Sequence, residues 1–370
     1  MIKEILKILS NPKVFVFTII WMMFLVFIGT IAQKDIGLYL AQEKYFSNWI
    51  TWFWFIPTPG GRLVMLIMFI NLASFLFLPI LWTKKKVGIL IVHFGAVLLL
   101  LGGGLTAWFS FEGNMILEEG SSSNYIINTQ QVELTIINTT NTNMDMVTAF
   151  DDKVLYSGKK LRHKSLPFSL EIIEFYTNCE PIKRAEVDNN NHGLAKNFTL
   201  KPLPVENDPQ MNRAGITFRI SSSNTNLDGI YSIFLGQSVM QTLQVNNEKF
   251  ILLLRRERIY LPFSIQLNDF KQVLHPGTEI AKSFSSDIFL IDNDISRRVL
   301  IQMNEPLRYK GYTFYQASFS QSEFGETSIL AVVKNYGRLF PYISSIIMSI
   351  GLLIHLLIKL PMLIKRKVNG

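Results

Sequence analysis

Two uninterrupted apolar stretches each contain one histidine: VGILIVHFGAVLLLLGGGLTAWF at 87–109 holds His93, and PYISSIIMSIGLLIHLLIKL at 341–360 holds His355. Each stretch is long enough to cross the hydrocarbon core of a bilayer as a helix. Ionisable side chains inside such helices are rare, and each is a functional-site hypothesis by default. Because imidazole binds metals and haem iron, the pair raises the question of a cofactor held within the membrane.

Four apolar stretches predict transmembrane helices, at residues 14–32, 63–82, 87–109 and about 339–360. The segment between the third and the fourth is polar and large enough for a core of its own. It contains short runs rich in β-branched and aromatic residues, and it shows no long amphipathic helical pattern. The runs that predict strands are VELTII (132–137), GITFRIS (215–221), KFILLL (249–254), DIFLID (287–292), RRVLIQM (297–303), YTFYQASF (312–319) and TSILAVV (327–333).

Charge is distributed unevenly between these parts. Residues 110–338 hold 23 Lys or Arg and 25 Asp or Glu, whereas the rest of the chain holds 13 basic and 3 acidic residues. The net charge of +8 therefore comes from the flanks of the apolar stretches, and a nucleic-acid-binding face is not expected. The basic flanks are Lys3, Lys7 and Lys13, then Lys84, Lys85 and Lys86, then Lys359, Lys365, Arg366 and Lys367.

The positive-inside rule places these flanks in the cytoplasm and residues 110–338 outside it. The sequence thus predicts a polytopic α-helical membrane protein with four transmembrane helices and a large all-β extracytoplasmic domain. Its three parts are an N-terminal membrane region (1–109), the β domain (110–338), and a last helix with a basic cytoplasmic tail (339–370). The first apolar run exceeds a typical signal-peptide core, so a retained helix is expected there.

An internal repeat lies within the predicted β domain. LPFSLEIIEFYTNCEP at 166–181 aligns with LPFSIQLNDFKQVLHP at 261–276, at a constant offset of 95 residues. Leu, Pro, Phe and Ser, a later Phe and the final Pro match, and Glu174 corresponds to Asp269. The repeat favours two related β lobes, with convergent amphipathic strands as the alternative.

Residues 33–62 are predicted to form a short outer loop. Its segment LYLAQEKYFSNWITWFWF (38–55) is unusually rich in aromatic residues. Such a segment is typical of the aromatic belt at a membrane interface or of a helix lying on the surface, and a platform that stacks a flat cofactor is the less favoured alternative.

The stretch at 87–109 carries glycines spaced by seven, at Gly88, Gly95 and Gly102. This small-residue seam predicts close packing against another helix, with His93 beside it. Ser344, Met348 and Gly351 share the helical face of His355. From the rise per residue, both histidines are expected at a similar depth, about 8–9 Å from the cytoplasmic ends of their helices.

No hydrolase, kinase, dinucleotide or zinc-protease motif occurs in the sequence. The one cysteine, Cys179, excludes an internal disulfide and is interpreted as a buried small side chain rather than a mixed-disulfide partner. His163, His192 and His275 lie in polar stretches and are interpreted as solvated, with His275 the first to check. For His93 and His355, a helix-to-helix hydrogen bond and ligation of haem iron stay equally open.

The chain resembles the ResB (also called CcsB) family of system II cytochrome c biogenesis along most of its length. The stretches that carry the resemblance are FIGTIAQKDIGLYLAQEKYF, PTPGGR, KKKVGILIVHFGAVLLLLGG, FEGNMILEEG, LPFSIQLNDF, AKSFSSDIFLID and MNEPLRYKGYTFYQASF, in this order. The resemblance implies a bacterial cytoplasmic-membrane protein that works with a ResC/CcsA-type partner. Together they would export haem b and attach it to apocytochrome c, with thiol-reducing proteins as further partners.

The resemblance also makes His93 an intramembrane ligand of haem iron, whereas His355 is added as a second cofactor-binding candidate by its depth and face. The tryptophan-rich W-x-x-W-x-W-D type segment of the partner is absent, because TWFWFIP does not match it. The chain is therefore expected to be a non-catalytic or co-catalytic subunit of a haem lyase complex, with no catalytic residue of its own. The alternatives are a membrane-anchored scaffold or apocytochrome chaperone without a haem ligand, and, less favoured, a sensor.

Overall fold

The computed structural model describes residues 2–141, 144–188, 191–222, 227–278, 281–322 and 325–368. The chain divides into two compact units. The helical unit comprises Met1–Phe111, Arg308–Thr313 and Val333–Gly370, and the β unit comprises Glu112–Leu307 and Phe314–Val332. Each unit is described by itself.

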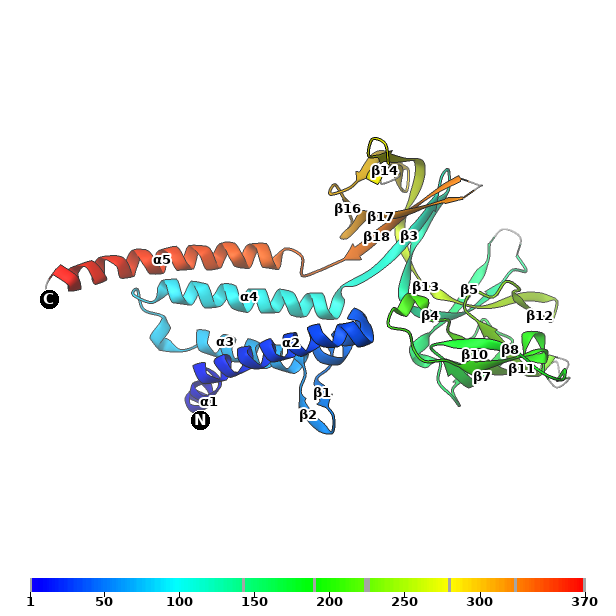
Figure 1. Cartoon of the computed structure of the whole chain (residues 1–370), viewed down its shortest axis with the longest axis horizontal. Coiled ribbons are helices and arrows are strands. Elements are labelled where there is room, and N and C mark those ends of the chain that lie inside the picture. The colour runs from blue at the N-terminus through cyan, green and yellow to red at the C-terminus, as the bar shows by residue number, and fades with distance from the viewer. Residues whose placement is uncertain are drawn as a thin grey trace. The chain divides into compact units, whose positions relative to one another are not determined.

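The helical unit contains five α-helices (Figure 1). Among the described residues, three helical segments are long and apolar enough to cross a membrane: Leu6–Ser47, Val87–Phe109 and Phe340–Pro361. The α-helices are α1 (Ile2–Leu9), α2 (Pro12–Gln42), α3 (Gly61–Leu76), α4 (Val87–Phe109) and α5 (Phe340–Val368).

Helix α3 is shorter than the span predicted at 63–82. It has 16 residues and ends at Leu76, and a 3-10 turn, η2 (Pro79–Leu81), follows. Proline disfavours helical backbone at the residue before it, and Leu78 is accordingly extended (φ −75°, ψ 122°). At 1.5 Å per residue α3 is about 24 Å long, less than the roughly 30 Å of a bilayer core.

The segment predicted as an outer loop at 33–62 is mostly regular structure. Helix α2 continues to Gln42 through a kink at Gly37 (φ 77°), and a π-helical turn, η1 (Glu43–Ser47), follows. A two-stranded hairpin, β1 (Ile50–Phe53) and β2 (Ile56–Pro59), then leads into α3. The aromatic composition predicted an interfacial element, but not a helix that turns back at a glycine.

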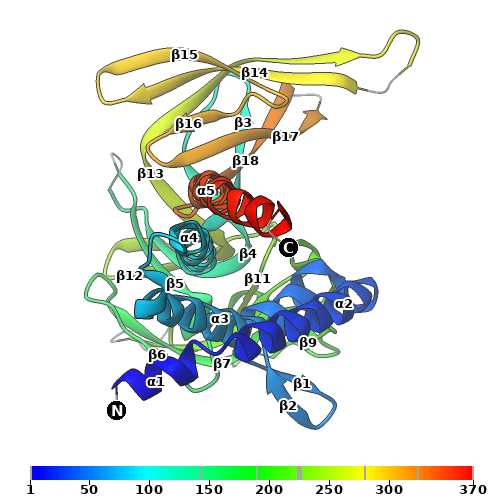
Figure 2. The ribbon, with the colours of Figure 1, turned by 90° about the vertical axis from the view of Figure 1, so that its left-hand side faces the viewer.

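Helices α4 and α5 lie side by side along the glycine seam (Figure 2). A Cβ atom at Gly88 would meet the backbone of His355, and one at Gly95 would lie 2.6 Å from the Met348 side chain. At Gly102 an added Cβ would meet Phe340. The seam therefore packs against a helix, as predicted, and that helix is α5.

The β unit consists of antiparallel strands, in agreement with the predicted all-β fold. One sheet has the strand order β11-β10-β7-β6. A larger sheet has the order β15-β14-β13-β4-β3-β18-β17-β16, and in it β12 also pairs with β13 and β5 with β4. Strands β8 and β9 form a separate pair. The strands are β3 (Phe111–Glu118), β4 (Ser122–Asn138), β5 (Met146–Asp151), β6 (Lys160–Leu161), β7 (Phe168–Tyr176), β8 (Cys179–Lys183), β9 (Phe198–Pro202), β10 (Gly215–Ser222), β11 (Gly229–Phe234), β12 (Gln241–Val245), β13 (Glu248–Leu274), β14 (Ala281–Asp292), β15 (Ile295–Gln302), β16 (Leu307–Tyr309), β17 (Tyr312–Ser322) and β18 (Gly325–Lys334).

Two long strands, β4 and β13, connect two lobes. Their register shifts between Arg256 and Arg258 and again between Tyr260 and Ile265. The halves at 132–138 and 248–256 face the four-stranded sheet around one cluster of buried apolar residues, which we call the first lobe. The other halves join β3 and β14–β18 in the second lobe, which buries Phe263 edge-on against Phe314 with ring centres 6.1 Å apart.

Candidate functional site

His93 lies in the first half of α4, and one of its ring nitrogens is already engaged. Its Nδ1 is 2.8 Å from the carbonyl oxygen of Ile89, one turn earlier. A carbonyl can only accept a hydrogen bond, so this contact requires the proton on Nδ1. In the neutral form of the ring, Nε2 then carries the lone pair that can bind a metal. Metal-binding histidines commonly have this arrangement, in which the second nitrogen donates to a backbone carbonyl or a carboxylate.

The side chain of His93 faces α3 and not the glycine seam. Its ring lies 4.6 Å, centre to centre, from the ring of Phe75, and the residue is half-buried. At 100° per residue, His93 is about 140° around α4 from Gly88 and about 160° from Gly95. The prediction that His93 lies beside the seam is therefore wrong. Helix α5 occupies the space beside these glycines, so the seam does not provide room for a flat ring.

His355 lies on the other side of α4, where its backbone packs against Gly88. It is half-buried, and its Nδ1 has no hydrogen-bond partner among the described residues. Gly88 precedes His93 by five residues, so the two histidines differ by about 8 Å along α4. This replaces the expectation of a common depth. The two histidines therefore differ in their surroundings: the imidazole of His93 lies against Phe75 of α3, whereas it is the backbone of His355 that packs on α4.

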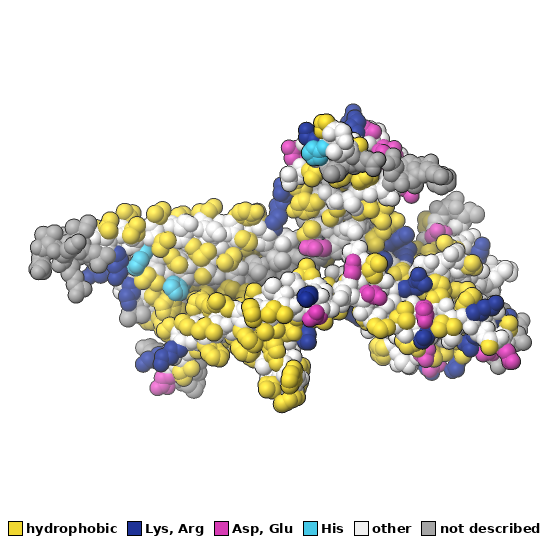
Figure 3. All heavy atoms as spheres, in the orientation of Figure 1, with side chains coloured by type: hydrophobic (Ala, Val, Ile, Leu, Met, Phe, Trp, Pro, Cys, Tyr) yellow, Lys and Arg dark blue, Asp and Glu magenta, His cyan; other side chains and the backbone are white. Residues whose placement is uncertain are grey.

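The His93 ring fits a ligand of haem iron, because a neutral ring that is held through Nδ1 keeps the lone pair of Nε2. His355 fits less well, since nothing fixes its ring. Among the residues that the structure describes, no three His, Cys, Asp or Glu side chains gather where they could hold a metal ion. Figure 3 shows histidine side chains on the largely apolar surface of the helices. Sequence reasoning did not identify Phe75 or Ile89 as partners of His93, although the i−4 spacing of Ile89 was available as a signal.

The other three histidines are held locally in the β unit. The Nδ1 of His163 lies 2.6 Å from the hydroxyl of Ser165, while His275 is exposed. His192 stacks on Tyr231 at 5.1 Å and contacts the Asp228 carbonyl oxygen. The structure does not bring them together into one site.

Cys179 is buried, with 1% of its surface exposed. Burial raises the pKa of its thiol to about 11, against a smaller opposite effect of Arg213. The thiolate is the reactive form of cysteine, so this side chain behaves as a small hydrophobic group at neutral pH. That agrees with the structural interpretation of Cys179.

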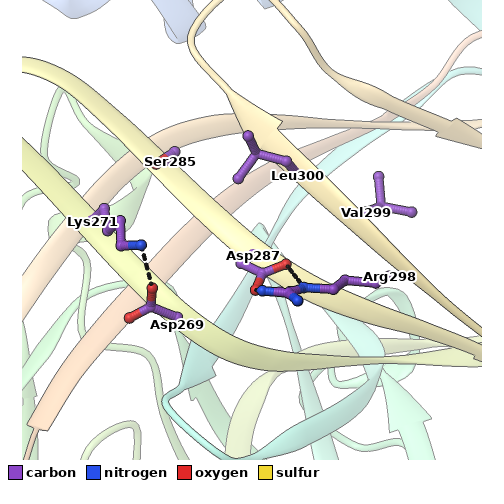
Figure 4. A pocket seen from close by; sticks show the side chains of 7 residues that line it. All are labelled: Asp269, Lys271, Ser285, Asp287, Arg298, Val299 and Leu300. Atoms are coloured by element: carbon purple, nitrogen blue, oxygen red, sulfur yellow. Dashed lines mark hydrogen bonds and ion pairs between the residues drawn. The ribbon is translucent and has the colours of Figure 1, made fainter.

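A shallow pocket of about 370 Å³ opens on the outer face of β13, β14 and β15 (Figure 4). Asp287 accepts two hydrogen bonds from Arg298 Nε, both of 2.9 Å, and a third from Arg298 Nη2. Lys271 pairs with Asp269 at 3.1 Å. Hydrogen bonding to Arg298 holds the pKa of Asp287 below its ordinary value of 3.8. Because every charge here has a partner of opposite sign, the pocket is best explained as a surface ion-pair network.

Comparison with known proteins gives two matches. A family model described as the ResB-like family matches residues 83–199 and 220–329. Protein NrfI of Wolinella succinogenes is 28% identical over 272 residues, which are 72% of this chain. The chain spans about a quarter (27%) of the length of that relative. The matched ranges include α4 with His93, most of the first lobe and much of the second.

Proposed function

The chain belongs to the ResB-like family, and on that premise we propose that it is a subunit of a system II cytochrome c synthase. In this proposal it acts with a ResC/CcsA-type membrane partner to move haem b outward and to attach it to apocytochrome c. In this proposal four helices cross the bacterial cytoplasmic membrane, and α3 is the shortest of them. The proposal also places the β unit on the extracytoplasmic side.

The observation that carries the proposal is the state of the His93 ring. Its Nδ1 donates to Ile89, and in the neutral ring Nε2 keeps its lone pair within an apolar helix. Bound haem would supply the iron and the vinyl groups that react with cysteine thiols. This chain would help to hold the haem through one imidazole nitrogen of His93, and the carbonyl of Ile89 would hold the orientation of that ring.

The β unit has the complementary role in this proposal. It would present apocytochrome c near the haem, while separate thiol-reducing proteins would keep the cysteines of apocytochrome c reduced. Cys179 cannot act as that reductant, because it is buried and has no second cysteine in the chain. The chain is thus assigned a haem-holding and positioning role, and the bond-forming chemistry requires its partner.

His93→Ala tests the proposal in the complex purified from membranes with its partner. We expect haem absorbance per complex to fall sharply while the protein still accumulates, and added imidazole to restore part of the cytochrome c yield. His355→Ala should have a smaller effect. Leu99→Ala is a matched control on the same helix, because Leu99 is an exposed side chain of α4 that makes no polar contact.

Unchanged haem content in both histidine variants would contradict the proposal and would favour the scaffold alternative. Topology is tested separately by phosphatase fusions in the full chain. A fusion after Gly158 should be active and one after Val368 inactive, since the basic flanks are expected to stay in the cytoplasm. The reverse pattern would overturn the orientation.

A further inference from the structure

The β1–β2 hairpin is firmly held at its base. Strand pairing runs from Ile50 with Pro59 to Phe53 with Ile56. The indole Nε1 of Trp21 on α2 donates to the Pro59 carbonyl at 2.9 Å. At the other end of the strand, next to the loop, the ring of Phe53 packs 5.6 Å from that of Phe24 on α2 and 5.8 Å from that of Tyr45. The base and one side of the hairpin are therefore part of the packed helical unit.

The two loop residues at the tip, Trp54 and Phe55, are by contrast left exposed by the residues that the structure describes. Trp54 is 94% exposed and Phe55 is 78% exposed, and Trp52 and Ile56 are also exposed. Residues 48–61 contain no charged side chain. Figures 1 and 2 both show the hairpin projecting sideways from α2 and α3, across the direction of the helices. Its apolar surface continues that of the helices in Figure 3.

The tip is also strained. Trp54 is the first residue of the two-residue loop, and its φ is +59°. Glycine is the usual residue with positive φ at this position of a tight hairpin, because a side chain there costs about 1–2 kcal/mol. The described part of the chain offers no contact that compensates for this cost, since the indole is almost fully exposed. An exposed aromatic residue in a strained turn indicates a binding role outside the folded chain.

The length of α3 sets the depth of the hairpin. With Lys84–Lys86 at the cytoplasmic side, Gly61 at the start of α3 lies about 24 Å outward from Leu76. Taking residues 77–83, between Leu76 and these lysines, to fill the remaining ~6 Å, Gly61 is level with the outer edge of a hydrocarbon core about 30 Å thick. Unpaired strand edges are excluded from the hydrocarbon itself but are satisfied by headgroups and water. Tryptophan is enriched at this interface, where its ring and its N–H are both accommodated.

We propose that the Trp54–Phe55 tip inserts into the outer-leaflet interface of the lipid bilayer and anchors the outer end of the short helix α3. The ligand is the interfacial lipid layer rather than a protein, because the tip is apolar and uncharged and continues the apolar helical surface. This inference rests on the membrane topology in the proposed function, but it does not depend on haem.

The test uses the full chain with Cys179→Ala and Phe55→Cys, spin-labelled and reconstituted in phosphatidylcholine–phosphatidylglycerol vesicles. The ratio of collision rates with oxygen and with a water-soluble nickel chelate reports depth. Leu357→Cys on α5 serves as the hydrocarbon reference, and Val239→Cys in the β unit serves as the water reference; both residues are exposed. We expect the ratio at residue 55 to lie between the two.

Three outcomes would contradict the expectation in distinguishable ways. A ratio at residue 55 equal to that at residue 239 would place the hairpin in water and overturn the anchor. Protection of residue 55 from both probes would mean that protein covers the tip, and would also overturn it. A water-like ratio at residue 357 would remove the membrane span itself, and with it the topology of the proposed function.

Trp54→Gly separates anchoring from folding. Glycine relieves the strained φ, so the variant should unfold no more easily in detergent than its parent. The label at residue 55 should nevertheless shift toward the nickel-accessible, water-like ratio, because the indole anchor is lost. An unchanged ratio in Trp54→Gly would show that the indole does not hold the tip in lipid, which would overturn its role as the anchor.

Discussion

The two halves of the internal repeat lie in different sheets, yet they have the same local structure. In β7 the pairing with β10 skips Ile173, and in β13 the pairing with β14 skips Asn268, which is the equivalent residue at the offset of 95. In each lobe a glycine of positive φ donates to an equivalent carbonyl at 2.8 Å, from Gly158 to Ile172 and from Gly120 to Leu267. The repeated sequence thus specifies a strand, a bulge and a carbonyl that accepts from a glycine outside the repeat, whichever sheet surrounds them.

The difference between the halves lies on the outward faces. The inward positions Phe168 and Phe263, Leu170 and Ile265, and Ile172 and Leu267 are all buried and apolar. On the opposite face of the first lobe, Thr217, which pairs with Glu174 of β7, shares a hydrogen bond with Ser232. In the second lobe Asp287, which pairs with the corresponding Asp269 of β13, forms an ion pair with Arg298. Packing density constrains the inward side chains, while the opposite face carries a pair of hydroxyl groups in one lobe and an ion pair in the other.

The largest expected effect comes from truncating the inward positions. Leu170→Ala and Ile265→Ala each remove a fully buried side chain, so each should lower the free energy of unfolding by about 2–5 kcal/mol. Denaturant titration of the full chain in detergent, with pulse proteolysis, measures this. If β4 and β13 couple the lobes, both variants shift one common transition. Two transitions, each shifted by only one variant, would show that the lobes are independent.

Gly120→Ala and Gly158→Ala test whether the two turns are equivalent. Nothing lies within 4 Å of an added Cβ at either position, so only the positive φ opposes the change. Both variants should therefore lose a similar free energy of unfolding, about 1–2 kcal/mol, in the same titration. A loss confined to one lobe would contradict the equivalence of the two turns.

Asp287→Asn should have a smaller effect than the glycine variants, because Arg298 is 67% exposed and solvent screens the pair. High salt should reduce the difference further. Since Arg298 lowers the pKa of Asp287, the pair contributes stability above the ordinary pKa of 3.8 and loses it as the pH falls through the lowered value. A wild-type stability advantage that persists below that range would contradict this assignment.

Cys179 gives the smallest expected effect. The offset of 95 pairs it with Leu274, an aliphatic residue, so Cys179→Ala should leave cytochrome c assembly largely intact. In the folded chain at pH 8, alkylation of Cys179 should be slow compared with the same chain in denaturant, because the pKa is about 11. Loss of assembly at normal protein levels would reveal a thiol step.

Sequence reasoning located elements well where one pattern dominated. The predicted bounds of the third span, 87–109, coincide with α4, because its apolar run is framed by lysines and by Ser110. It predicted too late an end for α3, because hydropathy does not record the effect of Pro79 on the backbone before it. It did not predict that α2 bends at Gly37, because an average of hydropathy carries no information on the positive φ of a glycine.

At the candidate site, the sequence indicated the residue type and the approximate depth, but not its surroundings. Glycine spacing predicted a helix partner for α4 without identifying it as α5. Once α5 fills the seam, His93 is left on the α3 side, against Phe75. Rotamer choice, which places Nδ1 on the Ile89 carbonyl, depends on tertiary packing that no sequence pattern records.

Strands β3 and β18 are neighbours in the large sheet, although more than 200 residues separate them. The first begins at Phe111, just after α4, and the second ends at Lys334, just before α5. The long segment between α4 and α5 thus begins and ends on adjacent strands, the arrangement found where one domain is inserted into another. A single genetic insertion into a helical hairpin suffices for this connectivity. The same geometry would let residues 112–332, with residues 308–313 of the helical unit included, be excised as one piece with its two ends already close together.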